Sequence, residues 1–197
     1  MTTPRSDSPL NWGVLYRRLS APLCDFDCGQ LCAPANKGIP ACCDNADCPP
    51  VLFTEELRWL RARTEQWRKR RAVSPHQKKD DREIEDYIVY AMCRGVESCK
   101  RRFRSLTCRF FPFEPYIDEK DRFQGLTWIY RCEHLCPLIG SRRYRINQQY
   151  VNQSIDLWKT LFALFPGERD CYCDESRKLR HRFAGEKRKI RVFRIRE

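Results

Sequence analysis

The cysteines are the residues of this chain whose side chains could do chemistry, because they are numerous and closely spaced. The thirteen cysteines are Cys24, Cys28, Cys32, Cys42, Cys43, Cys48, Cys93, Cys99, Cys108, Cys132, Cys136, Cys171 and Cys173. Closely spaced thiolates bind zinc or iron–sulfur clusters, because a single loop then presents several ligands together. Disulfide bonds and free structural thiols are the two alternatives at this density of cysteine.

The expected cellular compartment decides between these alternatives. The polar segment 1–9 lacks the apolar stretch of a secretory signal peptide. No window of the sequence approaches the apolar length of a transmembrane helix. We therefore expect a cytoplasmic protein that does not bind membranes, in which thiols stay free or bind metal. The odd cysteine count also fits poorly with complete disulfide pairing, so we treat all thirteen cysteines as candidate metal ligands.

The spacing of the cysteines leaves the number of metal sites open. Adjacent side chains diverge, so Cys42 and Cys43 can serve two centres, or one can ligate while the other packs. Thirteen thiols would fill three four-cysteine sites with one left over, whereas two sites with several structural or labile thiols is the more cautious count. Cys171 and Cys173 form either a further site together with Cys132 or an isolated reactive pair.

The order of the motifs resembles the CxxCxxCC family of zinc- or iron-chelating proteins (the YkgJ type), which includes flagellin lysine N-methylase. The matching segments are Cys24, Cys28-Gly29, Cys32 and Cys42-Cys43, then Pro50–Leu57, Cys93–Cys99, Arg104–Phe113 and Cys136–Gly140. The chain departs from the family pattern where about nine residues separate Cys32 from Cys42 and where Ser105 replaces the usual proline. Cys48, Cys132, Cys171 and Cys173 lie outside the resemblance.

The resemblance implies a metal cofactor, with iron–sulfur favoured over zinc, and we expect two or more clusters of the 4Fe-4S type. It also indicates Arg109 as a cofactor-binding residue, because Arg109 lies inside a matched motif. The residues agree independently, since aromatic side chains that exclude water and tune a cluster's potential surround Cys108 in the sequence. Basic residues from Lys100 to Arg109 would offset the charge of a thiolate-ligated cluster or would form a solvated face.

Three functions fit these features. The first is an iron–sulfur protein of redox or metal-dependent modifying type, such as a methyltransferase-like enzyme, acting on an unknown protein or small molecule. The second is a metal or cluster delivery factor that uses the surplus thiols. The third is a zinc-stabilised nucleic-acid-binding module, suggested by the formal net charge of +12. Nucleic acid is not favoured, because the aromatic residues cluster with cysteines rather than alternating with basic residues. No catalytic residue is indicated.

The elements that would position the cysteines are those of a small, irregular, metal-scaffolded α+β domain with few helices and short strands. Residues 1–145 should form the cysteine-rich domain, and 146–197 a helix plus a basic tail packed on it. We expect helices over residues 10–22, from Thr54 to Ser74-Pro75, and over 146–165. We expect strands at 87–90, at 110–117 and 126–131 as a hairpin, and at 189–195, with residues 24–50 as loop.

Overall fold

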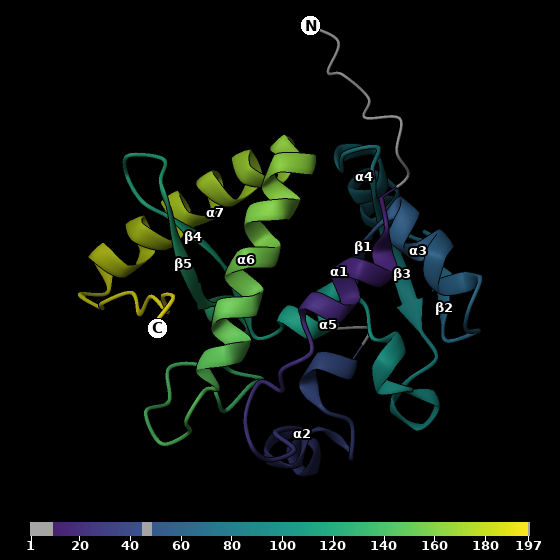
Figure 1. Ribbon diagram of the computed structural model, residues 1–197, viewed down its shortest axis with the longest axis horizontal. Helices are drawn as coiled ribbons and strands as arrows, with labels where there is room; N and C mark the ends of the chain where they lie inside the picture. Colours follow the sequence, from purple (N-terminus) through teal and green to yellow (C-terminus); the bar gives the residue numbers. More distant parts are fainter. Residues whose placement is uncertain (1–9, 45–48, 197) are drawn as a thin grey trace, which may run out of the picture.

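The computed structural model describes residues 10–44 and 49–196 as an α+β domain, which confirms the expected fold class (Figure 1). Cys48 lies outside the described residues. The α-helices are α1 (Trp12–Arg18), α2 (Gly29–Cys32), α3 (Thr54–Arg61), α4 (Pro75–Glu83), α5 (Leu106–Phe110), α6 (Gln148–Leu164) and α7 (Pro166–Gly185). The strands are β1 (Val51–Phe53), β2 (Trp67–Lys69), β3 (Ile88–Cys93), β4 (Phe113–Ile117) and β5 (Phe123–Trp128).

A three-stranded antiparallel sheet with the order β1-β3-β2 forms one part of the fold. Its register places Val51 opposite Tyr90 and Trp67 opposite Cys93. Successive residues of a strand point to opposite faces of the sheet. In β3, buried Val89 and Ala91 therefore face the core, while Tyr90 and Met92 face outward. Because β3 is central, it holds both edge strands and brings Cys93 to the end of the sheet.

The prediction of a single helix from Thr54 to Ser74-Pro75 was wrong about the length of the helix. The helix α3 ends at Arg61, and Trp67 begins the edge strand β2. Trp67 is buried, and its indole Nε1 donates a hydrogen bond to the carbonyl of Phe103 at 2.8 Å. This tertiary anchor overrides the helical spacing, and the basic residues after Arg61 therefore do not form a helical face.

A two-stranded hairpin of β4 and β5 forms the other part of the fold, as expected from the sequence. Within it, Phe113 stacks on Trp128 with ring centroids 4.2 Å apart. The helix α7 packs against β4 and α6, and the hydroxyl of Ser176 accepts a hydrogen bond from the backbone N–H of Ile117 at 3.0 Å. The C-terminal segment therefore shares one hydrophobic core with the cysteine-rich segment.

The long helix α6 lies between the hairpin and the three-stranded sheet in Figure 1. Its apolar stripe was the strongest helical pattern of the sequence, and the helix is confirmed. The helix α7 that follows was not expected, because charged residues dominate it and only Ser176 and Phe183 are buried. None of the helices within residues 10–44 and 49–196 is long and apolar enough to cross a bilayer.

The C-terminal strand expected at residues 189–195 is reduced to a single antiparallel bridge between Phe193 and Leu126. Gly125, just before this bridge, has φ +132°, and a Cβ atom there would lie 2.2 Å from the carbonyl oxygen of Phe193. We expect Gly125→Ala to lower the free energy of unfolding by about 1–3 kcal/mol, since either the bridge or the strand must move. Urea unfolding would measure this loss.

Gly185→Ala provides the control, because a Cβ atom at the end of α7 meets nothing within 4 Å. This variant should be neutral or slightly stabilising, because alanine reduces the freedom of the unfolded chain. Equal stability of the two variants would contradict the close approach of the C-terminal segment to Gly125.

Candidate metal centre

Five cysteines from three separate segments of the chain line one small cavity of about 20 Å³. Cys42 and Cys43 come from the short helix that ends at Cys43, Cys93 and Cys99 flank the turn after β3, and Cys108 lies on α5. The cavity is also lined by Pro50, Gln66 and Arg104. We call this group the five-cysteine cavity. It unites cysteines up to 66 positions apart, from Cys42 to Cys108.

Local structure explains how these thiols reach the same cavity. Cys93 ends the central strand β3, and Gly95 adopts φ +99°, a conformation that suits glycine, where the chain turns back toward Cys99. The helix α5 begins after Ser105, whose hydroxyl accepts a hydrogen bond from the backbone N–H of Cys108 at 3.3 Å. Ser105, which departs from the family pattern, thus caps the helix that carries Cys108.

Two polar side chains direct N–H groups at the sulfur atoms. The amide Nε2 of Gln66 lies 3.8 Å from the Sγ atoms of both Cys93 and Cys99, and Arg104 Nε lies 3.3 Å from the Sγ of Cys99. Gln66 is buried and held in place by the backbone N–H of Lys100, which donates to its Oε1 at 3.1 Å. Such donors stabilise thiolates and tune metal centres.

The sequence did not indicate Gln66 as a site residue. Its only signal is the pairing of its neighbour Trp67 with Cys93, which requires knowledge of β2. Arg104 was expected only as one of several basic residues that would offset the charge of a cluster or form a solvated face.

The thiols of this cavity have strongly perturbed acidities. The hydrogen bond from Cys42 and the nearby guanidinium of Arg104 lower the pKa of Cys43 to about 7, while the pKa of Cys42 is raised. Burial raises the pKa of Cys108 to about 12, and the neighbouring Cys93 and Cys43 add to the effect. Because metal binding needs thiolates, a cation must supply the charge that keeps the buried thiols deprotonated.

In the metal-free, reduced protein, we expect Cys43 to react with iodoacetamide with a midpoint near pH 7. The thiolate is the nucleophile, and the hydrogen bond from Cys42 favours the thiolate of Cys43. Cys171 offers an internal comparison, because it is more exposed yet its pKa is raised by burial and by Glu168. Peptide mass spectrometry after labelling at several pH values measures both midpoints. A lower midpoint for Cys171 than for Cys43 would contradict the prediction.

A second group of thiols lies next to the five-cysteine cavity. Cys28 donates a hydrogen bond to Cys24, and burial together with this bond and the nearby Cys24 and Cys136 raises the pKa of Cys28 to about 12. Cys136 is perturbed in turn by Cys32 and Cys132. The members of this second group are Cys24, Cys28, Cys32, Cys132 and Cys136.

The backbone links the two groups directly. The N–H of Ala41 donates a hydrogen bond to the Sγ of Cys32 at 3.3 Å, and the next residue along the chain is Cys42. Across the described residues, however, no three Cys, His, Asp or Glu side chains are placed so as to hold one metal ion together. The thiols are gathered but do not converge on a single point.

The guanidinium of Arg109, which we expect to bind a cofactor, is engaged by the backbone of neighbouring segments, and its role toward a cofactor stays a prediction. Its guanidinium donates hydrogen bonds to the backbone carbonyls of Tyr16, Leu19, Arg102 and Arg104 at 2.9–3.3 Å. It also stacks over the ring of Tyr16 at 4.5 Å. Arg109 therefore ties α5 to α1 and to the loop before α5, while Arg104 is the arginine that contacts a cavity thiol.

Cys171 and Cys173 lie on α7, and neither lines the five-cysteine cavity. The charged groups that perturb Cys171 are led by Glu168, and those that perturb Cys173 are led by Asp121. His134, between Cys132 and Cys136, is exposed.

Comparison with protein-family models, with curated proteins and with solved structures gives no match to this chain. The resemblance to the CxxCxxCC family therefore stays a prediction.

Proposed function

We propose that the protein binds an iron–sulfur cluster through thiolates of the five-cysteine cavity and acts in redox or metal-dependent modifying chemistry. The observation that carries this proposal is that five thiols from three chain segments line one cavity. Ligands of a shared centre must lie together, and these five cysteines do so although they come from segments far apart in the sequence.

The donor set fits such a group. A 4Fe-4S cluster needs four thiolates, and the cavity offers five. Gln66 and Arg104 would donate hydrogen bonds to the ligand sulfurs, which raises the reduction potential of a cluster. The cluster would supply electron transfer or an iron atom with an open position for substrate.

The spacing of the thiols also favours a cluster over one tetrahedral ion. A single zinc with bonds of about 2.3 Å holds its sulfurs about 3.8 Å apart, and the described residues contain no such set of three ligands. Several irons distribute the ligands over a larger frame. The second group, from Cys24 to Cys136, offers thiols for another cluster, in keeping with the proposal of two or more.

Zinc is the second candidate, and the size of the cavity favours it. About 20 Å³ is roughly the space of one water molecule, which suits one ion better than a cluster. Zinc would make the site structural and would leave the chain a binding module. Either metal requires reduced thiols, so we propose a cytoplasmic location.

Anaerobic purification followed by iron, sulfide and zinc analysis and Mössbauer spectroscopy tests the proposal. We expect a brown protein with about equal amounts of iron and acid-labile sulfide, at about four irons for each cluster. A colourless protein with stoichiometric zinc would overturn the iron–sulfur proposal in favour of zinc. Transfer of the cluster to an apo acceptor protein would instead indicate a delivery factor.

A further inference from the structure

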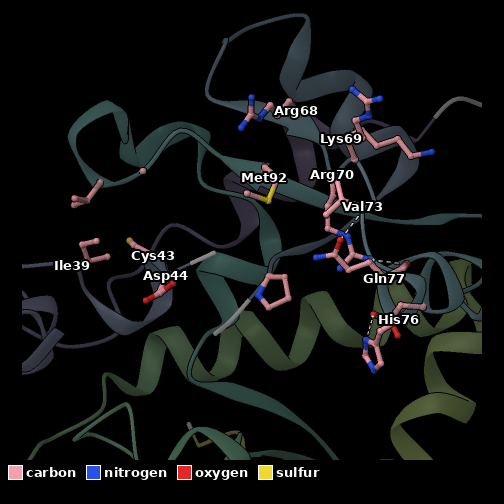
Figure 2. A pocket seen from close by; sticks show the side chains of 15 residues that line it. Ile39, Cys43, Asp44, Arg68, Lys69, Arg70, Val73, His76, Gln77 and Met92 are labelled. Carbon is pink, nitrogen blue, oxygen red and sulfur yellow. Dashed lines mark hydrogen bonds and ion pairs between the residues drawn. The ribbon is translucent and has the colours of Figure 1, made fainter. Parts of the chain in front are cut away.

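A groove of about 1030 Å³ runs beside the five-cysteine cavity, and Cys43 lines both. Figure 2 shows Cys43, Asp44 and Ile39 on one side of the groove, Arg68, Lys69, Arg70 and Val73 on the opposite side, and Met92 between them. The groove therefore lies along β2 and the outer face of β3. The side chain of Cys43 therefore separates the groove from the cavity and lines both.

The β2 side of the groove carries unpaired positive charge. Arg68, Lys69 and Arg71 are exposed, and none forms an ion pair with another described residue. Arg70 differs, because it contacts Asp81 at 2.5 Å and stacks over Tyr90 at 3.8 Å. Arg70 thus fixes the wall, while the other three cations remain open to a ligand.

The carboxylates of the groove do not neutralise these cations. Asp80 lies 3.3 Å from His76, and Asp44 lies 3.4 Å from the side-chain amide of Asn36. Among the described residues, four basic residues of the segment 68–71 therefore face two engaged carboxylates, which gives this part of the groove a positive net charge.

Apolar side chains complete the groove. Val73 is 73% exposed, and Ile39 and Val96 are each 38% exposed. These are three of the seven large hydrophobic side chains exposed among the described residues, and all three line this groove. Exposed apolar side chains that gather in one place mark binding sites rather than random surface. No Phe, Tyr or Trp side chain of the described residues lines the groove, so it lacks the large stacking platform of a single-stranded nucleic acid site.

The edge of the sheet favours an extended ligand. The order β1-β3-β2 leaves β2 at an edge. The carbonyl of Gln66 accepts a hydrogen bond from the N–H of Arg94, just after β3, and the N–H of Arg70 donates to the carbonyl of Tyr90 in β3. The alternating backbone groups of Trp67 and Lys69 therefore point away from β3. An edge of this kind can pair with an added strand from another protein.

We propose that this groove binds an extended, acidic segment of a partner protein and places it against Cys43. Carboxylates of the segment meet Arg68, Lys69 and Arg71, while its apolar side chains contact Val73 and Val96. Binding itself does not need a metal. Its meaning as presentation of a substrate or redox partner to the metal centre rests on the proposed function.

The test uses the full chain and a fluorescein-labelled peptide in which glutamate and valine alternate. We expect the peptide to bind, and the double variant Arg68→Glu/Arg71→Glu to bind about tenfold more weakly or worse. The matched control is Arg17→Glu/Lys120→Glu, which makes the same charge change at exposed residues outside the groove. Raising the salt from about 50 to about 500 mM should weaken binding to unaltered protein.

Equal binding by the two double variants would overturn the proposal, as would equal binding of a lysine–valine peptide. Tighter binding of a labelled single-stranded oligonucleotide would also overturn it, in favour of nucleic acid. Metal content is measured on the same samples and should be the same in both double variants. If the protein binds the peptide but contains no metal, the groove proposal holds and the proposed metal centre is refuted. If it contains metal but does not bind the peptide, the metal centre holds and the groove proposal is refuted.

Discussion

The double variant Cys93→Ser/Cys108→Ser will retain less than about one tenth of the metal that the unaltered chain binds, because tight binding needs a complete thiolate set. Cys93 and Cys108 come from β3 and α5, so their loss leaves three thiols at the five-cysteine cavity. Metal and sulfide analysis after anaerobic purification gives the content per chain.

Cys171→Ser/Cys173→Ser is the matched control, because it removes two thiols that lie outside both groups. It should keep the full metal content. The first variant should also unfold at a lower denaturant concentration, since the free energy of metal binding contributes to folding. Equal metal loss in both variants would contradict the assignment of the site to the cavity.

The sequence predicted the elements whose patterns are local. The apolar stripe of α6 has a clear helical period, and the prolines of the segment 110–117 favour an extended chain. The helix and the hairpin both form, although β4 begins only at Phe113 because Phe110 belongs to α5. The prediction of a helix through Trp67 failed because one buried tryptophan, bonded to Phe103 and paired across a sheet, outweighs helical spacing. The helix α7 was not predicted because charged residues dominate its sequence and only Ser176 and Phe183 are buried, so no apolar stripe is visible.

The grouping of the cysteines could not be predicted, because it depends on contacts distant in sequence. Sequence order places Cys42 with Cys32, yet Cys42 shares a cavity with Cys93 and Cys108, and Cys32 lies with Cys136. Gln66 carries no motif and becomes a site residue only through the pairing of β2 with β3. Arg109 stands in a matched motif, but its four backbone carbonyl partners are invisible in the sequence.

Glu56 on α3 is a buried residue whose carboxyl group links α3 to α1 and α5. Its Oε1 accepts hydrogen bonds from the hydroxyl of Tyr16 at 2.5 Å and from the backbone N–H of Leu106 at 2.7 Å. Burial raises the pKa of Glu56 from 4.5 to about 7, although these hydrogen bonds and Arg109 oppose the rise. The folded protein therefore prefers the neutral carboxyl group at acidic pH.

The sign of the resulting pH dependence follows from this shift. A carboxyl group with a folded pKa above its unfolded pKa stabilises the fold most below about pH 4.5, and that stabilisation is lost as the pH rises through about 7. The full shift corresponds to about 3 kcal/mol. Glu114 and Glu168 act in the same direction, because burial raises the pKa of each to about 7.

Glu56→Gln should reduce the slope of this dependence between about pH 5 and 6.5, because glutamine keeps the Oε1 acceptor for Tyr16 and Leu106 but does not titrate, while Glu114 and Glu168 still titrate. Urea unfolding at several pH values gives the slope, which separates loss of titration from any constant cost of the substitution. Glu55→Gln, at the exposed neighbouring position, should run parallel to the unaltered protein. Parallel curves for Glu56→Gln as well would mean that Glu56 ionises as readily in the folded chain as in the unfolded chain, despite its burial.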